Sequence, residues 1–113
     1  MGKKVFVVDD YPDIRLILKK LLQGAGHLVK LEAGAVNEAL GLIEEAKKEG
    51  IEVAVLDNSL GGGGDGSTIA AALRKEIPGI KIISFSTLDD LKWPEIAVVK
   101  PDFRKVIEAV TNI

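Results

Sequence analysis

The sequence contains no cysteine and only one histidine, His27. Disulfides, thiol chemistry, cysteine-based zinc sites and histidine-rich metal sites are therefore excluded. The formal net charge is only −2, which gives no electrostatic reason to expect nucleic acid or an anionic membrane as a partner. No apolar stretch approaches the length of a membrane span, and the first residues are too few for a secretory signal. We expect a cytoplasmic location, and we expect His27 to be a solvated turn residue.

The chain also lacks linkers, internal repeats and low-complexity tails, so its 113 residues predict one domain spanning 1–113. With 47% hydrophobic residues, a chain of this length can build a core without disulfides or metal ions. The only biased stretch is a glycine run at 61–64. This run predicts a loose loop, because each glycine adds backbone freedom. A phosphate-cradling P-loop is the alternative, but no Gly-Lys-Ser or Gly-Lys-Thr follows.

Short apolar, β-branched runs alternate along the chain with amphipathic segments. Strands are predicted at 4–8, 28–32, 53–57, 80–85 and 96–99. The run at 53–57 reads as a central strand buried on both faces, because four apolar residues lead directly into Asp57. Helices are predicted at 12–24, around an apolar face at 39–46, from a cap at Asp65 or Ser67 to Glu76, and over 103–110. The alternation predicts an α/β fold with a parallel sheet.

Polar side chains gather at one edge of this predicted sheet, because right-handed crossovers bring the carboxyl ends of parallel strands together. They are Asp9, Asp10, Asp57, Ser86, Thr87 and Lys100. Three carboxylates in one place repel one another, so they either share a proton or bind a hard cation such as Mg²⁺. A carboxylate nucleophile, a divalent metal, a lysine and a hydroxyl are what attack of an aspartate on a phosphoryl group requires.

Each of these residues also has an ordinary structural explanation. A single strand-end aspartate often caps a turn, and a helix dipole favours one of Asp9 and Asp10. Ser86 can be a turn hydroxyl, and Ser84 faces the same side of its strand. Lys100 can be a solvated surface lysine. These explanations do not account for carboxylates, a hydroxyl and a lysine at matching strand ends.

The same residues resemble the receiver domains of two-component response regulators, over essentially the whole sequence. Val7-Val8-Asp9-Asp10 resembles the family's acidic pair after the first strand, and Val55-Leu56-Asp57 resembles its phosphoacceptor strand. Ser86 falls at the switch Ser/Thr position, and Lys100-Pro101 at the lysine–proline pair after the fifth strand. The resemblance implies a flavodoxin-like, doubly wound sheet of five parallel strands in the order 2-1-3-4-5, with helices on both faces.

The resemblance also implies a metal and an acceptor. Asp57 would accept a phosphoryl group from a phosphohistidine or a small phosphodonor. Asp10, Asp57 and the backbone carbonyl of Ser59 would ligate Mg²⁺ directly, with Asp9 acting through water. Apart from this Mg²⁺-dependent self-phosphorylation and slow hydrolysis of the acyl phosphate, no enzymatic activity is implied.

Three further residues would respond to the phosphoryl group. Lys100 would contact it, and the Lys100–Pro101 peptide would be cis. Ser86 would hydrogen-bond a phosphoryl oxygen once Asp57 is modified and would draw its loop inward. The backbone N–H of Thr87 would be a further donor.

Several features depart from the family. Only residues 87–99 lie between Ser86 and Lys100, so at most about one helical turn fits before the fifth strand. We therefore expect the family's fourth helix to be short or missing. The family's aromatic switch position is Ala97 here, which has no rotamer to change. Gly61 replaces a usual proline, and its loop looks one residue longer.

The first hypothesis is therefore a phosphoacceptor receiver domain in a phosphorelay. Its implied partners are a sensor histidine kinase or phosphotransfer protein and an unknown downstream protein target. No direct binding of nucleic acid or membrane is expected, and the chain is expected to be a monomer or weak dimer. The second hypothesis is a pseudo-receiver, an interaction module not regulated by phosphorylation, which Ala97 and the missing helix favour. A third is a phosphohydrolase, but the sequence indicates no aligned acid/base pair or substrate pocket.

Overall fold

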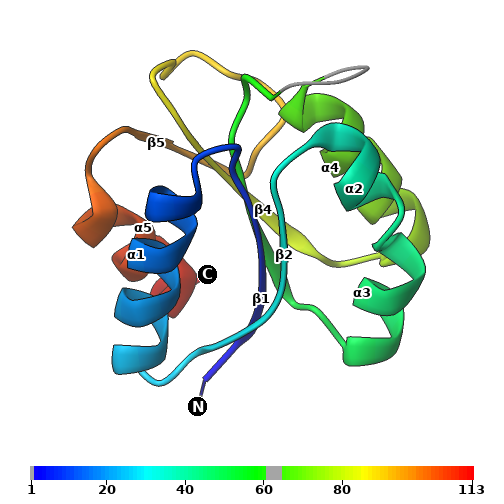
Figure 1. Cartoon of the computed structure of the whole chain (residues 1–113), viewed down its shortest axis with the longest axis horizontal. Helices are drawn as coiled ribbons and strands as arrows, with labels where there is room; N and C mark the ends of the chain where they lie inside the picture. The colour runs from blue at the N-terminus through cyan, green and yellow to red at the C-terminus, as the bar shows by residue number, and fades with distance from the viewer. Residues whose placement is uncertain (1, 61–64) are drawn as a thin grey trace.

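A parallel sheet organises the chain in the computed structural model, which describes residues 2–60 and 65–113 (Figure 1). The strands lie in the order β2-β1-β3-β4-β5, and every neighbouring pair is parallel. The predicted doubly wound, flavodoxin-like α/β fold is therefore confirmed. The strands are β1 (Lys4–Val8), β2 (Leu28–Ala33), β3 (Val53–Leu56), β4 (Lys81–Ser86) and β5 (Ile96–Val99). The helices in the described ranges are α1 (Pro12–Gly24), α2 (Val36–Leu40), α3 (Ile43–Glu49), α4 (Gly66–Glu76) and α5 (Phe103–Asn112).

The central strands contribute to two apolar layers, because successive side chains of a strand point to opposite faces. Phe6 and Leu56 pack with α2, α3 and α4, whereas Val7 and Val55 pack with α1 and α5. Figure 1 shows these two groups of helices on opposite sides of the sheet. The apolar residues of β1 and β3 are buried on both faces, which explains why their sequences are continuous apolar runs. The polar residues that follow these strands lie at the end of the sheet where the carboxyl ends of the parallel strands meet, which is called the sheet edge below.

One predicted helix is divided in two. The apolar face at 39–46 predicts one continuous helix, but the structure has α2 and α3 with Gly41 and Leu42 between them. Glycine weakens a helix interior, because it loses the most backbone freedom on folding. Leu42 has left the helical conformation, with φ −103° and ψ 4°. Ala39, Ile43 and Ala46 are nevertheless all buried, so the predicted face is confirmed although its continuity is wrong.

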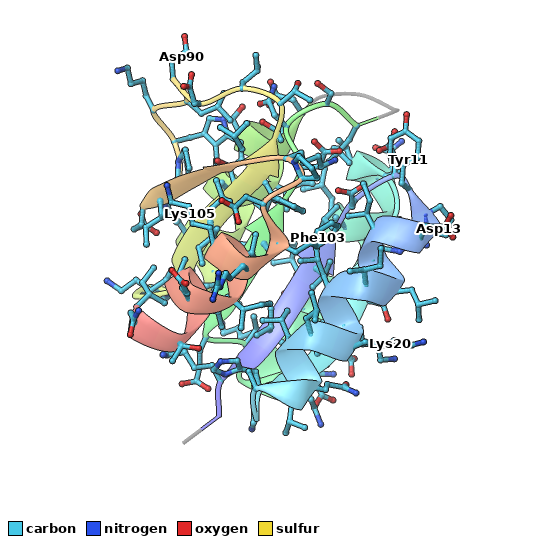
Figure 2. The ribbon with its side chains drawn as sticks, turned by 90° about the vertical axis from the view of Figure 1, so that its left-hand side faces the viewer. Tyr11, Asp13, Lys20, Asp90, Phe103 and Lys105 are labelled. Atoms are coloured by element: carbon cyan, nitrogen blue, oxygen red, sulfur yellow. The ribbon has the colours of Figure 1, made fainter. Side chains whose placement is uncertain are left out.

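No helix joins β4 to β5, because residues 87–95 are all described and none is helical. The helix that the family has between the fourth and fifth strands was expected to be short or missing, and it is missing here. It is a different helix from the one labelled α4, which precedes β4. Trp93 packs against the layer that α2, α3 and α4 form with the sheet. Glu95 anchors the end of the segment: its carboxylate pairs with Arg74 of α4 and accepts the Ile82 N–H at 2.6 Å. Figure 2 shows Asp90 at the outer tip of this segment.

The loop between β3 and α4 is described only in part. The glycine run at 61–64, with its predicted loose conformation, its extra length and its alternative as a phosphate cradle, lies outside the described residues. Asp65 caps α4 as predicted, because its carboxylate accepts the Ser67 N–H at 2.9 Å. Within 2–60 and 65–113, no helix has the length and apolar character that a membrane span requires.

His27 is buried and not solvated, so this prediction is wrong. Only 3% of the residue is exposed. Its Nδ1 accepts the Lys3 backbone N–H at 3.0 Å, and its Nε2 lies 3.0 Å from the Thr111 hydroxyl oxygen. Burial, and then the positive charge of Lys3, lower the pKa of the imidazole below its ordinary value of 6.5. The sequence could not show this, because both partners are remote along the chain.

The folded protein should lose stability as the pH falls below about 6.5, because His27 binds a proton more readily in the unfolded chain. The contribution of neutral His27 is complete above that pH and is lost as the pH falls through the lower folded pKa. Urea unfolding of the wild type and of His27→Gln from about pH 8 to about pH 5 measures it, since glutamine cannot titrate. The difference in unfolding free energy between the two proteins should shrink toward acid. A difference that stays constant with pH would contradict this assignment.

Candidate functional site

The three aspartates predicted at the sheet edge lie together. Asp9 and Asp10 follow β1, and Asp57 follows the neighbouring strand β3. Each offers a carboxylate oxygen, and these oxygens all lie within 4.8 Å of one another. Asp9 and Asp57 have exposed fractions of 1% and 4%, whereas Asp10 is exposed to solvent. An open cluster of carboxylate oxygens fits a hard divalent cation such as Mg²⁺.

Lys100 brings a positive charge into this cluster from the end of β5. Its Nζ lies 2.9 Å from Asp9 Oδ2 and 3.1 Å from Asp57 Oδ2. The aromatic rings of Tyr11 and Phe85 lie near the ammonium group, each with its centroid 5.8 Å from Nζ. Lys100 is therefore a partner of two buried carboxylates and not a solvated surface lysine.

Burial and the contacts between these groups shift two pKa values at the site. Burial raises the pKa of the Asp57 carboxyl above its ordinary value, although the hydrogen bond from Lys100 opposes this. Burial alone would lower the pKa of the Lys100 ammonium, but its hydrogen bonds to Asp9 and Asp57 outweigh burial and raise it. Lys100 therefore stays charged at neutral pH. Asp57 takes up a proton more readily in acid than an exposed aspartate does.

Two backbone features complete the surroundings of Asp57 and Lys100. The Ser59 N–H donates a hydrogen bond to Asp57 Oδ1 at 3.3 Å, which places Ser59 beside the carboxylate. The role of the Ser59 carbonyl as a metal ligand stays a prediction. The Lys100–Pro101 peptide is cis, as the resemblance implied.

Ser86 ends β4 next to Lys100, whose backbone N–H donates to the Ser86 carbonyl at 2.8 Å. The Ser86 hydroxyl is bonded to the segment that follows it. It accepts the Leu88 N–H at 3.1 Å and donates to the Leu88 carbonyl at 3.3 Å. Thr87 lies between them and is exposed. The structure therefore brings Ser86 and Thr87 to the sheet edge, with the Ser86 hydroxyl engaged by Leu88.

Ser84, the competing hydroxyl, lies farther from the edge. It pairs with Ala97 in the β-ladder, whereas Ser86 pairs with Val99, the residue before Lys100. Ser84 is fully buried, and within the described part of the chain its hydroxyl has no hydrogen-bond partner. The register thus supports Ser86 as the hydroxyl at the site.

Two residues at this edge were not anticipated from the sequence. Arg15 of α1 donates from Nη1 to the backbone carbonyl of Asp9 at 2.6 Å. Gly66 starts α4 against the site, since a Cβ built on it would lie 2.5 Å from the Asp57 carbonyl oxygen and 2.8 Å from the Trp93 ring. The only signal for Arg15 is its place on the helix that follows the acidic pair. The sequence signal for Gly66 is its place in the Asp65-Gly66 pair, which resembles the family's Asp-Gly pair after the phosphoacceptor strand.

Domains with an open, parallel α/β sheet form a class that binds ligands at the carboxyl ends of the strands. The polar groups described above lie at those strand ends. Within this class, the sequence matches the response regulator receiver domain over residues 5–107. Because this match covers most of the chain, the protein belongs to that family, the receiver domains of two-component systems. No curated protein matches the sequence.

Solved structures of receiver domains share the fold. A CheY-like response regulator receiver domain protein from Methanospirillum hungatei has a TM-score of 0.81 at 23% identity, covering 98% of this chain and 92% of that chain. The CheX–CheY–BeF₃–Mg complex from Borrelia burgdorferi contains a chain with a TM-score of 0.84 at 22% identity, covering 96% and 87%. The response regulator domain of Thermotoga maritima CheB has a TM-score of 0.76 at 20% identity, covering 98% and 92%. At these identities the likeness establishes the fold.

Proposed function

We propose that residues 1–113 form one phosphoacceptor receiver domain of a phosphorelay and that Asp57 is its phosphorylation site. The observation that carries this proposal is the Lys100 ammonium, which lies 3.1 Å from Asp57 and 2.9 Å from Asp9. A cation held between the nucleophile and a second carboxylate is placed to stabilise the charge on a transferred phosphoryl group. Clustered buried charges cost stability, so a domain that served only as a scaffold would have no reason to keep them.

The chemistry is phosphoryl transfer to a carboxylate. A carboxylate oxygen of Asp57 attacks the phosphorus and forms an O–P bond. The bond from phosphorus to the donor breaks, and its electron pair leaves on the donor's nitrogen or oxygen. Asp9, Asp10, Asp57 and the Ser59 carbonyl would hold Mg²⁺, which supplies positive charge against the phosphoryl oxygens. Lys100 contacts a phosphoryl oxygen, and a water later hydrolyses the acyl phosphate and restores Asp57.

Phosphorylation would then change the segment at 87–95. The Ser86 hydroxyl would exchange its bonds with Leu88 for a phosphoryl oxygen, and the Thr87 N–H would donate to the same group. Ala97 has no rotamer to change. The displacement would therefore pass into the segment that carries Trp93, instead of through an aromatic side chain on β5.

The partners follow from this role. The phosphodonor would be a sensor histidine kinase or a phosphotransfer protein, and the output would be binding of a downstream protein target. Large apolar side chains on and before α1 are exposed and offer a contact surface: Tyr11, Leu16, Ile17 and Leu21. Figure 2 shows Tyr11 at the start of this helix. The domain would act in the cytoplasm as a monomer or weak dimer, without direct binding of nucleic acid or membrane.

The fluorescence of Trp93 tests this function, because Trp93 is the only tryptophan and lies in the segment that should move. We expect a saturable change on titration with Mg²⁺ and a second change on addition of beryllium fluoride, which mimics a phosphoryl group. Intact mass after treatment with acetyl phosphate should rise by one phosphoryl group, and chelation of Mg²⁺ should prevent this.

The outcomes separate the proposed function from the alternative. A fluorescence response to Mg²⁺ alone, together with the mass of the phosphorylated protein, would support Asp57 as the acceptor. It would contradict the coupling of phosphorylation to the segment that carries Trp93. An unchanged mass together with an unchanged fluorescence would contradict phosphorylation and would favour the pseudo-receiver.

A further inference from the structure

The two aspartates after β1 are held in different ways. The Asp9 carboxylate is fixed twice, because Oδ2 lies 2.9 Å from Lys100 Nζ and Oδ1 accepts the Tyr11 N–H at 3.0 Å. The Asp10 carboxylate is exposed, and no hydrogen bond or ion pair within the described chain reaches it. Its direction toward the other carboxylates therefore depends on the backbone that carries it.

That backbone is held by one side chain. Arg15 Nη1 donates to the Asp9 carbonyl oxygen at 2.6 Å, and this oxygen belongs to the peptide group that joins Asp9 to Asp10. A peptide group is planar, so a fixed carbonyl oxygen also fixes the direction in which the Asp10 Cα leaves. On the other side of Asp9, its N–H donates to the Ala33 carbonyl at 3.1 Å.

The Arg15 guanidinium is itself held in place. Its Nε lies 3.6 Å from Glu32 Oε1, so one planar group spans the Asp9 carbonyl and a carboxylate on β2. Gly34 leaves room for it, because a Cβ built there would lie 2.9 Å from Nη1. Lysine has a single nitrogen and cannot span both acceptors with the same rigidity.

We propose that Arg15 is a positioning residue for Mg²⁺: by holding the Asp9–Asp10 peptide, it aims the Asp10 carboxylate at the site formed with Asp9 and Asp57. The inference rests on the proposed function, because it requires that the acidic cluster binds the metal. It assigns a functional role to a side chain that does not touch the metal or the phosphoryl group.

Titration of Mg²⁺, followed by the backbone amide NMR signals of Asp10 and Asp57, tests the proposal without any phosphorylation. Arg15→Met should weaken Mg²⁺ binding by about tenfold, the effect usual for residues that orient metal ligands. Arg15→Lys should restore part of the affinity. The matched control is Lys19→Met, because Lys19 also pairs with Glu32, at 3.5 Å, but makes no contact with the Asp9 carbonyl.

Glu32→Gln is an intermediate variant, since it removes both ion pairs that involve Glu32 and leaves the bond from Arg15 to Asp9. Lys19→Met should keep the Mg²⁺ affinity within about twofold of the wild type, because such partly exposed ion pairs contribute little. The affinity of Glu32→Gln should lie between those of Lys19→Met and Arg15→Met. Urea unfolding of each variant separates a loss of fold from a loss of affinity.

The results distinguish two kinds of failure. A folded Arg15→Met protein that binds Mg²⁺ within twofold of the wild type would overturn the positioning role and leave the proposed function standing. A wild type that binds no Mg²⁺ would overturn the metal site itself, and the proposed function with it.

Discussion

Asp57→Asn is expected to abolish the acyl phosphate completely, because a neutral amide oxygen does not attack phosphorus as a carboxylate does. The fold should survive. Lys100 keeps its contact with Asp9 at 2.9 Å, and the amide oxygen can still accept a hydrogen bond from Lys100. Burial raises the pKa of Asp57, so its ionised form costs stability at neutral pH. The free energy of unfolding should therefore be unchanged or higher, by less than about 1 kcal/mol.

Intact mass after treatment with acetyl phosphate and Mg²⁺, together with urea unfolding, measures both effects. Asp13→Asn is a suitable control, because Asp13 is an exposed aspartate in the first turn of α1 that lies outside the acidic cluster. This variant should be phosphorylated like the wild type. If Asp57→Asn retained the added mass, Asp57 would not be the acceptor.

Gly66→Ala is expected to be the most damaging small substitution near the site. The added Cβ would lie 2.5 Å from the Asp57 carbonyl oxygen and 2.8 Å from the Trp93 ring, so backbone or ring must move. Overpacking of this kind costs about 1–3 kcal/mol of unfolding free energy. Because the crowded oxygen belongs to Asp57, Mg²⁺-dependent phosphorylation should slow as well. Urea unfolding and the rate of mass increase with acetyl phosphate measure the two losses.

Gly24→Ala provides the matched control, because a Cβ built at that helical position meets no atom within 4 Å apart from its chain neighbours and the backbone of its own helix. It should raise the stability by up to about 1 kcal/mol, since alanine is the better helix former. Combining Gly66→Ala with Trp93→Ala should recover only part of the loss, because the contact with the Asp57 carbonyl remains. Wild-type stability in Gly66→Ala alone would show that the packing described around Gly66 is wrong.

The sheet and its polar edge could be predicted because their signals are local. β1 and β3 are apolar on both faces, so each appears in the sequence as an uninterrupted run that ends on aspartate. Parallel pairing then brings the strand ends together without further information. The absent helix between β4 and β5 followed from the small number of residues available there. For these features, the residues that decide the structure are neighbours in the chain.

The remaining features depend on partners that are distant along the chain. His27 is buried by Lys3 and Thr111, which lie near the two ends of the sequence. Trp93 and Gly66 meet only after α4 and the 87–95 segment have packed on the same layer. The division between α2 and α3 had a local signal in Gly41, but a glycine is compatible with either outcome. The long-range contacts of His27, Gly66 and Trp93 are not encoded by any short sequence pattern.

The connection between β4 and β5 contains no helix, which limits how a partner protein could detect phosphorylation of this domain. A helix can transmit a shift along its length as a rigid rod, since each turn is hydrogen-bonded to the next. Residues 87–95 have no such internal bonding, and Glu95 secures their far end to Arg74 and Ile82. In the proposed switch, a displacement that starts at Ser86 would therefore be confined to a short stretch of surface. A target protein that distinguished the phosphorylated domain through this displacement would have to touch residues 87–95 itself, so that contact would be local and small.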